Sequence, residues 1–476
     1  MGKIVQLRFV CGGIFTKTRE KTENGLFFAL RGEAFDGADF ALEAVKNGAV
    51  AIVCERLTGA PVPHILVENC REALARYASA FYGFACERLR IIAITGTNGK
   101  TTTAHILASI LREAGKKVGV IGTLGAFYDG IERPTELTTP DPIALHKLLL
   151  EMSIVGVEYV VMEASAHALH YDKLAGLRYA ACIFSNLTQD HLDFFPTMQA
   201  YENAKIKLFT PELCPIAILN GDDETGRRIG ALRGDAPTVY YGLQTPCDCF
   251  AIVTNESVYG SECMLNICDK LVRTSIPLLG EYNLYNAMSA ALCALSLGID
   301  LSAIAKGIAL FKGAKGRLER ILEHHGAAVL VDFAHTPDGL EKCLTALKKH
   351  CQGRLVCLFG CGGNRDRSKR ALMGETVSKI ADFAVLTSDN PRYEDPLDII
   401  VEIERGYRRF STKYVVVPDR ERAIDYALDF VAKGDILLVA GKGAEAYQEI
   451  MGIKYPFSDK DIIEKISKEK GESFSL

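Results

Sequence analysis

The chain has 476 residues, of which 48% are hydrophobic and 24% are charged. This length predicts roughly two to four domains, and the hydrophobic content excludes a disordered or fibrous protein. Lys and Arg number 55 against 59 Asp and Glu, so the formal net charge of -4 supplies no broad positive field. We therefore expect no nucleic-acid binding, and any phosphate recognition must be local.

The cysteines and the first residues of the chain indicate in which cell compartment the protein is expected. Fifteen cysteines are scattered along the chain without a Cys-x-x-Cys pair, which favours reduced thiols over disulfides or a zinc site. The opening MGKIVQLRFV lacks the long apolar region of a signal peptide. No apolar stretch approaches the roughly 20 residues of a membrane helix. We expect a cytoplasmic protein with no membrane insertion.

The predicted elements alternate between strands and helices. Short strands are predicted at 25–30, 49–54 and 64–67, followed by a helix over 70–84. A second unit begins with a buried strand at 91–95, a glycine turn and a helix over 101–114. Five further strands are predicted at 327–331, 355–359, 383–387, 414–417 and 436–440. The pattern predicts an α/β fold with mostly parallel sheets in three domains, residues 1–88, 89–312 and 313–476.

The strongest local motif is GTNGKTT, residues 96–102, between the strand at 91–95 and the following helix. Backbone amides of such a turn can converge on phosphate oxygens at a helix N-terminus. Lys100 would add a positive charge, and the Thr101 hydroxyl could join a magnesium shell. Ile94 stands where the standard pattern has glycine, so the motif is a shortened variant. We interpret it as a nucleotide site rather than an ordinary glycine-rich turn.

A second group of polar residues comprises Glu163, His191, Asp193 and Lys205. Two of their segments follow strand-like runs at 159–162 and 180–184, and ligands gather at the carboxyl ends of parallel strands. Glu163 and His191 could hold one magnesium ion together with nucleotide phosphates. From spacing alone, polar residues that merely begin loops are an equally good interpretation.

Several motifs of the last domain directly follow predicted strands. They are GRLE at 316–319, DFAHTP at 332–337, GCGGNRDRSKR at 360–370, DNPR at 389–392 and GKG at 441–443. We predict that Arg365 and Arg392 recognise carboxylate or phosphate groups. For Arg367 and Lys369 we expect a solvated basic loop. His335 either assists near the nucleotide or is a structural histidine in a turn.

Taken together, GTNGKTT, TTPDP, NLTQDHLDFF, GEYNLYN, GRLE, DFAHTPDGL, GCGGNRDRSKR and DNPR resemble the motifs of the Mur ligases, in the same order. These ATP-dependent amino-acid ligases build the stem peptide of peptidoglycan. The resemblance implies an N-terminal domain for the UDP moiety, a central P-loop domain for ATP and a C-terminal Rossmann-like domain for the amino acid. It is weakest in residues 1–24 and 225–273. We expect a monomer that acts on small-molecule substrates.

The resemblance also implies roles for individual residues. ATP binding falls to Gly96, Thr97, Asn98, Gly99, Lys100, Thr101, Thr102, Asn283, Arg317 and Asp332. Magnesium (Mg²⁺) would be held by Thr101, Glu163 and His191. Lys205 would be carbamylated to N6-carboxylysine, because a free ammonium would repel the metal whereas its CO2 adduct is an anion. Lys100, Glu163, His191 and Lys205 would thus be the catalytic residues.

The substrate positions carry departures from the family pattern. The UDP-muramoyl dipeptide would meet Thr18, Thr138, Thr139, Ser165, Tyr171 and Lys173. Meso-diaminopimelate would meet Arg365, Asp389, Asn390, Pro391, Arg392, Gly441 and Glu445. Lys17-Thr-Arg19 replaces an Asp-Ser-Arg, Ala166 replaces a serine, Lys173 an arginine and Ala444 a histidine.

The choice of amino acid depends mainly on Arg392. Meso-diaminopimelate differs from lysine by a second carboxylate, and leaving it unpaired would cost about 2–5 kcal/mol. An intact DNPR therefore favours diaminopimelate, joined to the D-glutamate γ-carboxylate through an acyl phosphate. The alternatives are the same reaction with L-lysine or another diamino acid, a folylpolyglutamate or cyanophycin-type ligase, and a non-catalytic nucleotide-binding cell-wall scaffold.

Overall fold

The computed structural model describes residues 11–32, 35–257 and 260–470. The prediction that MGKIVQLRFV is not a signal peptide lies outside these residues. The chain divides into two compact units. The first comprises Met1–Ala93, Lys117–Ala180 and Glu212–Cys214, and the second Ile94–Lys116, Ala181–Pro211 and Pro215–Leu476. Because these units cut the chain elsewhere, the boundaries at 88 and 312 stay a prediction.

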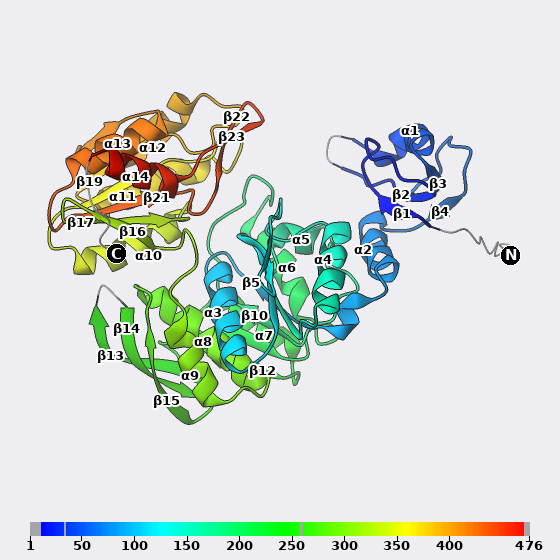
Figure 1. The fold of residues 1–476 in the computed structure, drawn as a ribbon, viewed down its shortest axis with the longest axis horizontal. Helices are drawn as coiled ribbons and strands as arrows, with labels where there is room; N and C mark the ends of the chain where they lie inside the picture. Colours follow the sequence, from blue (N-terminus) through cyan, green and yellow to red (C-terminus); the bar gives the residue numbers. More distant parts are fainter. Residues whose placement is uncertain (1–10, 33–34, 258–259, 471–476) are drawn as a thin grey trace. The chain divides into compact units, whose positions relative to one another are not determined.

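The first unit contains a four-stranded parallel sheet, drawn in blue in Figure 1. Its order is β1 (Gly13–Phe15), β2 (Gly25–Phe28), β3 (Ala49–Cys54), β4 (His64–Leu66). Phe15, Phe27 and Ile52 pack with α1 (Ala41–Lys46) in one core, whereas the alternate strand residues pack with α2 (Cys70–Phe81) in another. The helix predicted at 70–84 ends early, and Phe84 has a left-handed φ of +52°. The short turns η1 (Gly37–Phe40) and η2 (Ala85–Arg88) complete this part.

The rest of the first unit is built around two parallel strands, β6 (Val118–Gly122) and β9 (Tyr159–Glu163). β7 (Gly125–Tyr128) and β8 (Ile131–Arg133) extend β6 as antiparallel strands that the sequence pattern did not predict. α4 (Pro142–Ile154) precedes β9, and the short helix α5 (Ala166–His170) follows it. Glu163, at the end of β9, is therefore fixed by a buried strand.

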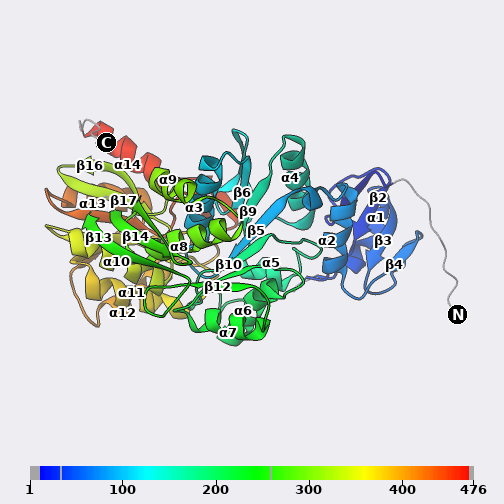
Figure 2. The same ribbon diagram turned by 90° about the horizontal axis from the view of Figure 1, so that it is seen from below.

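The largest sheet has eleven strands in the order β15-β14-β13-β12-β11-β10-β5-β9-β6-β7-β8. β5 (Arg90–Thr95) leads into α3 (Lys100–Glu113). β10 (Ala181–Phe184), β11 (Ala217–Asn220) and β12 (Thr238–Tyr241) run parallel, with α6 (Met198–Ile206), η3 (Lys207–Phe209) and α7 (Glu224–Arg233) between them. α8 (Glu281–Ser296) and α9 (Leu301–Leu310) pack beside α3 (Figures 1 and 2).

One edge of this sheet is an antiparallel meander of β13 (Cys249–Ser257), β14 (Gly260–Ile267) and β15 (Lys270–Ile276). Most of it lies within residues 225–273, where the family resemblance is weak. Cys268 and Asp269 form the tight turn between β14 and β15 with φ values of +50° and +62°. The meander was not predicted from the sequence, because β13 carries few buried residues.

The C-terminal sheet has the order β16-β17-β21-β18-β19-β20. The five predicted strands are confirmed as β17 (Ala327–Asp332), β18 (Leu355–Phe359), β19 (Phe383–Leu386), β20 (Tyr414–Val416) and β21 (Ile436–Ala440), all parallel. β16 (Glu319–His324) is an antiparallel edge strand that was not predicted.

Helices cover both faces of the C-terminal sheet (Figure 1). α10 (Pro337–His350), α11 (Ser368–Ile380) and α12 (Pro396–Tyr407) fill one core, and α13 (Arg420–Phe430) and α14 (Asp459–Glu469) the other. A separate hairpin of β22 (Tyr447–Ile450) and β23 (Ile453–Pro456) follows β21. The α/β class with mostly parallel sheets is thus confirmed.

No cysteine of the described residues forms a disulfide, and Cys268 is the exposed one among them. Most of the others are buried in the cores. Within the described ranges, no helix combines the length and apolar character needed to cross a membrane.

Candidate active site

The loop between β5 and α3 requires glycine at two positions. Gly96 has φ +148° and Gly99 has φ +87°. A Cβ at Gly96 would lie 1.9 Å from Ser185 Oγ, and one at Gly99 would lie 2.4 Å from Asn286 Oδ1. Both the backbone conformation and the close neighbours therefore exclude a side chain.

The shape of this loop is held by the residues that follow β10. Ser185 Oγ donates to the Asn98 carbonyl at 2.6 Å, and Asn186 Oδ1 accepts from the Asn98 amide at 2.9 Å. The Thr97 amide donates to the Asn186 carbonyl at 2.9 Å. Two of the amides expected to cradle phosphate are thus used to shape the loop. Lys100 Nζ donates to the Gly96 and Thr97 carbonyls, each at 2.9 Å.

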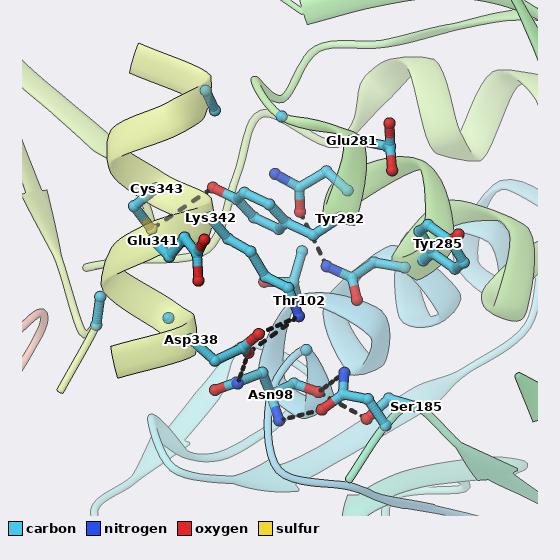
Figure 3. A pocket seen from close by; sticks show the side chains of 18 of the residues that line it. Asn98, Thr102, Ser185, Glu281, Tyr282, Tyr285, Asp338, Glu341, Lys342 and Cys343 are labelled. Atoms are coloured by element: carbon cyan, nitrogen blue, oxygen red, sulfur yellow. Dashed lines mark hydrogen bonds and ion pairs between the residues drawn. The ribbon is translucent and has the colours of Figure 1, made fainter. Parts of the chain in front are cut away.

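A pocket of about 640 Å³ opens beside this loop (Figure 3). Six of the residues predicted to bind ATP line it: Asn98, Gly99, Thr102, Asn283, Arg317 and Asp332. Other residues that line the pocket were not predicted from the sequence, among them Asn186, Tyr282, Tyr285, Asp338, Lys342 and Cys343. Asn186 belongs to NLTQDHLDFF and Asp338 to DFAHTPDGL, so membership of these motifs was an available signal.

Asp338, in the first turn of α10, connects this helix to the loop. Its carboxylate accepts from Asn98 Nδ2 at 2.8 Å and from Lys342 Nζ at 2.9 Å (Figure 3). The Lys342 ammonium therefore lies close to the loop and neutralises the carboxylate.

Asp332, at the end of β17, and Arg317 are two further residues that line this pocket. Asp332 accepts from the amides of Leu318 and Ala334, each at 2.6 Å, and burial raises its pKa although Arg317 and these bonds oppose the rise. Arg317 Nη2 donates to Thr101 Oγ1 at 3.3 Å, and its guanidinium lies 4.6 Å from the Phe333 ring centre. Thr101 and Arg317, far apart in sequence, are thus in contact.

A buried carboxylate, Asp190, lies close to one lysine and two histidines around the NLTQDH motif. Its oxygens lie 3.5 Å from His191 Nε2, 3.7 Å from His335 Nε2 and 3.5 Å from Lys369 Nζ. Burial would raise the pKa of Asp190, but His335, Lys369 and His191 hold it well below its usual value. His335 Nδ1 lies 2.8 Å from the Phe333 carbonyl, so both ring nitrogens have partners.

The expectation that Lys369 is solvated is wrong. Its side chain is 8% exposed and is balanced by Asp190. Arg367 is 65% exposed and pairs with Glu402 near the surface, as expected. Arg365 reaches Asp193 at 3.7 Å. The basic residues after β18 are therefore divided between the buried Lys369 and Arg370 and the exposed Arg365 and Arg367.

Lys205 is buried near the end of α6, with Nζ 4.3 Å from the Tyr201 ring centre. Burial, and then the neighbouring Lys100, lowers its pKa well below the usual value, although Asp190 opposes the shift. Its amine is therefore more readily neutral than that of an ordinary lysine.

The predicted dipeptide residues of the first unit form one hydrogen-bonded group around Glu163. Thr123 donates to the Glu163 carboxylate from its amide at 2.9 Å and from its hydroxyl at 3.1 Å. Thr139 Oγ1 lies 2.8 Å from the Glu163 carbonyl and accepts from the Ser165 amide at 2.9 Å. Thr138 Oγ1 lies 3.1 Å from Thr123 Oγ1.

The remaining dipeptide candidates have other partners. Lys173 Nζ pairs with Asp141 at 2.6 Å, so this lysine is held by the TTPDP segment. The Tyr171 ring lies 4.3 Å from the Arg71 guanidinium. Thr18 is half-buried, and its carbonyl accepts from Asn47 Nδ2 at 2.5 Å. In the described part of the chain, no group of three or more His, Cys, Asp or Glu side chains forms a metal site on its own.

The DNPR residues meet the loop after β21 in a charged network. Asn390 Nδ2 donates to Glu445 Oε2 at 2.9 Å, and the fully buried Lys442 donates to Asn390 Oδ1 at 3.1 Å and to Glu445 at 3.0 Å. Burial would raise the pKa of Asp389, but Lys442 and then Arg420 bring it below its usual value. A Cβ at Gly441 would lie 2.6 Å from Asp389 Oδ2. Ala444 is exposed, so the missing imidazole leaves no gap in this network.

Arg392 is held in an unusual conformation at the edge of this network. Its φ is +53°, which is uncommon for a residue with a side chain. Nε donates to Glu449 Oε2 at 3.2 Å, and Nη1 donates to the Gly363 carbonyl at 2.8 Å. The structure thus brings Asp389, Asn390, Arg392, Gly441 and Glu445 together around strand ends of one sheet.

Comparison with known sequences finds three matching family domains. Residues 12–82 match the Mur ligase family, catalytic domain; residues 94–294 the Mur ligase middle domain; and residues 316–443 the Mur ligase, glutamate ligase domain. A relative from Geobacillus thermodenitrificans, a UDP-N-acetylmuramoyl-L-alanyl-D-glutamate--2,6-diaminopimelate ligase, is 40% identical over 460 residues, 95% of this chain and 94% of its own length. A relative of the same name from Aquifex aeolicus is 40% identical over 458 residues, 95% and 93% of the two chains.

Comparison with solved structures finds members of the same family. The structure of a UDP-N-acetylmuramoyl-L-alanyl-D-glutamate--2,6-diaminopimelate ligase matches with a TM-score of 0.69 and 30% identity, covering 99% of this chain and 98% of the other. The MurF ligase from Thermotoga maritima in complex with ADP shares the fold with a TM-score of 0.66 at 21% identity, over 96% and 98% of the two chains. The chain therefore belongs to the Mur ligase family.

Proposed function

We propose that this chain is an ATP-dependent ligase that joins meso-diaminopimelate to UDP-N-acetylmuramoyl-L-alanyl-D-glutamate. The relatives that bear this activity in their names align over nearly the whole chain at about 40% identity. The observation that carries the proposal is the charged network of Asp389, Glu445 and Arg392. It combines acidic groups with a guanidinium, as a site for an amino acid requires.

The charge pattern of this network favours diaminopimelate over lysine. The far end of diaminopimelate carries an ammonium and a carboxylate, whereas that of lysine carries only an ammonium. Asp389 and Glu445 suit the ammonium, and Arg392 suits the carboxylate through its planar fork. Pro391 and Gly441 shape the loops that carry these groups, and Arg365 stands on the neighbouring loop.

The reaction requires activation of a carboxylate. An oxygen of the D-glutamate γ-carboxylate attacks the γ-phosphorus of ATP, the bond to ADP breaks, and an acyl phosphate forms. The diaminopimelate amine then attacks the acyl carbon, and the tetrahedral intermediate expels phosphate and loses a proton. In this scheme Lys100 and the first turn of α3 stabilise the charge on the phosphoryl group, as preorganised donors do.

ATP occupies the pocket beside the phosphate loop in this proposal. The loop residues 96–102 face the phosphates, Asn283 meets the adenine, and Arg317 and Asp332 complete the pocket wall. The support is that Asn98, Gly99, Thr102, Asn283, Arg317 and Asp332 line one pocket, and that Arg317 reaches Thr101.

Magnesium fits the donor chemistry of Thr101, Glu163 and His191, which offer a hydroxyl, a carboxylate and an imidazole. An ion held by these residues would also take ligands from the nucleotide phosphates. When bound, the ion neutralises phosphate charge. Thr123 orients the Glu163 carboxylate through two hydrogen bonds.

Lys205 carries a carbamate in this proposal. Its neutral amine adds to CO2, a C–N bond forms, and one proton is released, which leaves an anionic carboxylate on Nζ. The lowered pKa of Lys205 supports this step, because only the neutral amine is nucleophilic. A carbamate at this position would also relieve the repulsion between Lys205 and Lys100.

The UDP-muramoyl dipeptide is assigned to Thr18, Thr138, Thr139, Ser165, Tyr171 and Lys173. The support is that Thr138, Thr139 and Ser165 belong to one hydrogen-bonded group that includes Glu163. We further propose three domains, 1–88, 89–312 and 313–476, and a monomer that works in the cytoplasm, where this precursor and ATP are available.

The test is ADP release by the full chain with UDP-muramoyl-L-alanyl-D-glutamate and, in separate reactions, meso-diaminopimelate, L-lysine and L-ornithine. We expect turnover with diaminopimelate at least tenfold above that with either other amino acid. Equal or greater turnover with lysine would contradict the assigned specificity. No ADP release with any of the three would contradict the ligase itself and favour a non-catalytic binding protein.

A further inference from the structure

The hairpin of β22 and β23 is joined to DNPR by both backbone and side chains. The Arg392 amide donates to the Glu449 carbonyl at 3.0 Å, and the Met451 amide donates to the Arg392 carbonyl at 2.7 Å. Gln448 Nε2 donates to the Asp389 carbonyl at 2.7 Å, and the Glu449 amide donates to Asn390 Oδ1 at 2.9 Å. The hairpin thus supports the backbone of Arg392 in its left-handed conformation.

Glu449 is the hairpin residue that also fixes the side chain of Arg392. Its Oε2 accepts from Arg392 Nε at 3.2 Å, while the Gly363 carbonyl accepts from Nη1 at 2.8 Å. A guanidinium is planar, so partners on Nε and on one terminal nitrogen fix the orientation of the whole fork. Both side chains are about one-fifth exposed, 17% for Arg392 and 21% for Glu449, which strengthens their attraction relative to a surface pair.

We propose that Glu449 is a positioning residue that orients Arg392 toward the far carboxylate of the amino-acid substrate and so increases the preference for diaminopimelate over lysine. This inference rests on the proposed function. Glu449 acts through Arg392. It does not itself contact the substrate carboxylate, because two negative charges would repel each other. The remaining terminal N–H groups of Arg392 are then presented in one direction, as bidentate recognition requires.

The matched variants are Glu449→Ala, which removes the acceptor, and Glu449→Gln, which keeps an amide oxygen in its place. We expect Glu449→Ala to raise the KM for meso-diaminopimelate about tenfold, with kcat and the KM values for ATP and UDP-muramoyl dipeptide changed less than twofold. The KM for L-lysine should stay constant, so discrimination falls by the same factor. Glu449→Gln should recover most of the lost affinity. Glu404→Ala is the control, because Glu404 on α12 also pairs with an arginine, Arg408, just after that helix.

Three outcomes would overturn the inference. They are unchanged discrimination in Glu449→Ala, a joint rise of the KM values for diaminopimelate and lysine, and a fall of the KM for diaminopimelate. The last would mean that Glu449 competes with the substrate. A second readout needs no turnover. The Nε–H proton of Arg392, observed in ¹⁵N spectra and assigned through Arg392→Lys, should exchange slowly with solvent in the wild type and rapidly in Glu449→Ala. If the wild type shows no ligase activity, the proposed function fails, and this resonance still decides whether Glu449 holds Arg392.

Discussion

The phosphate loop and the DNPR network achieve order by different means. The loop takes its shape from glycines at positive φ and from backbone hydrogen bonds to Ser185 and Asn186. The DNPR network takes its shape from buried and partly buried charged side chains contributed by three separate segments. The glycines of the loop are a signal within one short segment, although Ser185 and Asn186 come from elsewhere in the chain. The charged network has no such local signal and depends on which segments the fold brings together.

The largest effect is expected for Gly96→Ala, because this position of the phosphate loop has no room for a side chain. The added Cβ would lie 1.9 Å from Ser185 Oγ at a φ of +148°. We expect ADP release to fall roughly 1,000-fold, because the loop must shift away from its phosphate-binding shape. Gly115→Ala is the control, since Gly115 also has a positive φ, +75°, but its Cβ would meet nothing within 4 Å. Near-normal turnover in Gly96→Ala would show that the loop is more compliant than its packing indicates.

Lys205→Ala probes the part of the nucleotide region that depends on side-chain chemistry. We expect turnover to fall about 100-fold, and short-chain carboxylic acids to restore part of it by supplying the missing carboxylate. The exposed neighbour Lys207 provides the control variant Lys207→Ala. Mass spectrometry of the native protein under CO2 should show an added carboxylate. Loss of activity without any rescue would argue against the carbamate.

Arg392→Ala tests the DNPR network directly. We expect the KM for diaminopimelate to rise about 30-fold or more, which corresponds to about 2 kcal/mol, because the far carboxylate loses its partner. The KM for ATP should remain within twofold. Arg367→Ala, at an exposed position on the neighbouring loop, is the control. An equal loss of affinity for every substrate would instead indicate misfolding.

The smallest effect concerns acid stability near the same network. The fully buried Arg370 donates to both oxygens of Glu394 at 2.9 Å, and these bonds lower the pKa of Glu394 from 4.5 to about 2. A pKa that is lower in the folded state stabilises the protein above pH 4.5, and this stabilisation disappears as the pH falls from 4.5 to 2.

Urea unfolding of wild type and Glu394→Gln between pH 2 and 7 measures that contribution. We expect the variant to be less stable than the wild type by about 1–2 kcal/mol at pH 7, a value discounted for solvent exposure, and the difference to shrink below pH 4.5. Glu404→Gln serves as the comparison on α12. A difference between wild type and Glu394→Gln that is independent of pH would mean that the ion pair is not its source.

The elements that sequence predicts well are those with a local signal. The strand, glycine turn and helix around 91–114 and the five parallel strands of the last sheet follow from continuous apolar runs, and the structure confirms them. The meander β13–β15 and the hairpin β22–β23 were missed because their strands are partly exposed and lack such runs.

The candidate site shows the same limit. GTNGKTT and DNPR can be recognised as candidate site segments from sequence alone. Nothing near Lys369 in the sequence, however, indicates that its buried ammonium pairs with Asp190, 179 positions away. Asp338 and Glu449 were missed for a related reason, since their importance comes from contacts with Asn98 and Arg392 that only the fold creates. Roles assigned through the family resemblance remain predictions for the experiments above.

The turn between β14 and β15 offers a practical route to following this enzyme in solution. Because Cys268 is the exposed thiol among the described residues, a maleimide dye can be attached there once the half-buried Cys11, Cys247 and Cys351 are replaced. Burial and the neighbouring Asp248 raise the pKa of the Cys268 thiol, so labelling should proceed best at mildly alkaline pH. A fluorophore at this position would report on the meander while substrates are added one at a time.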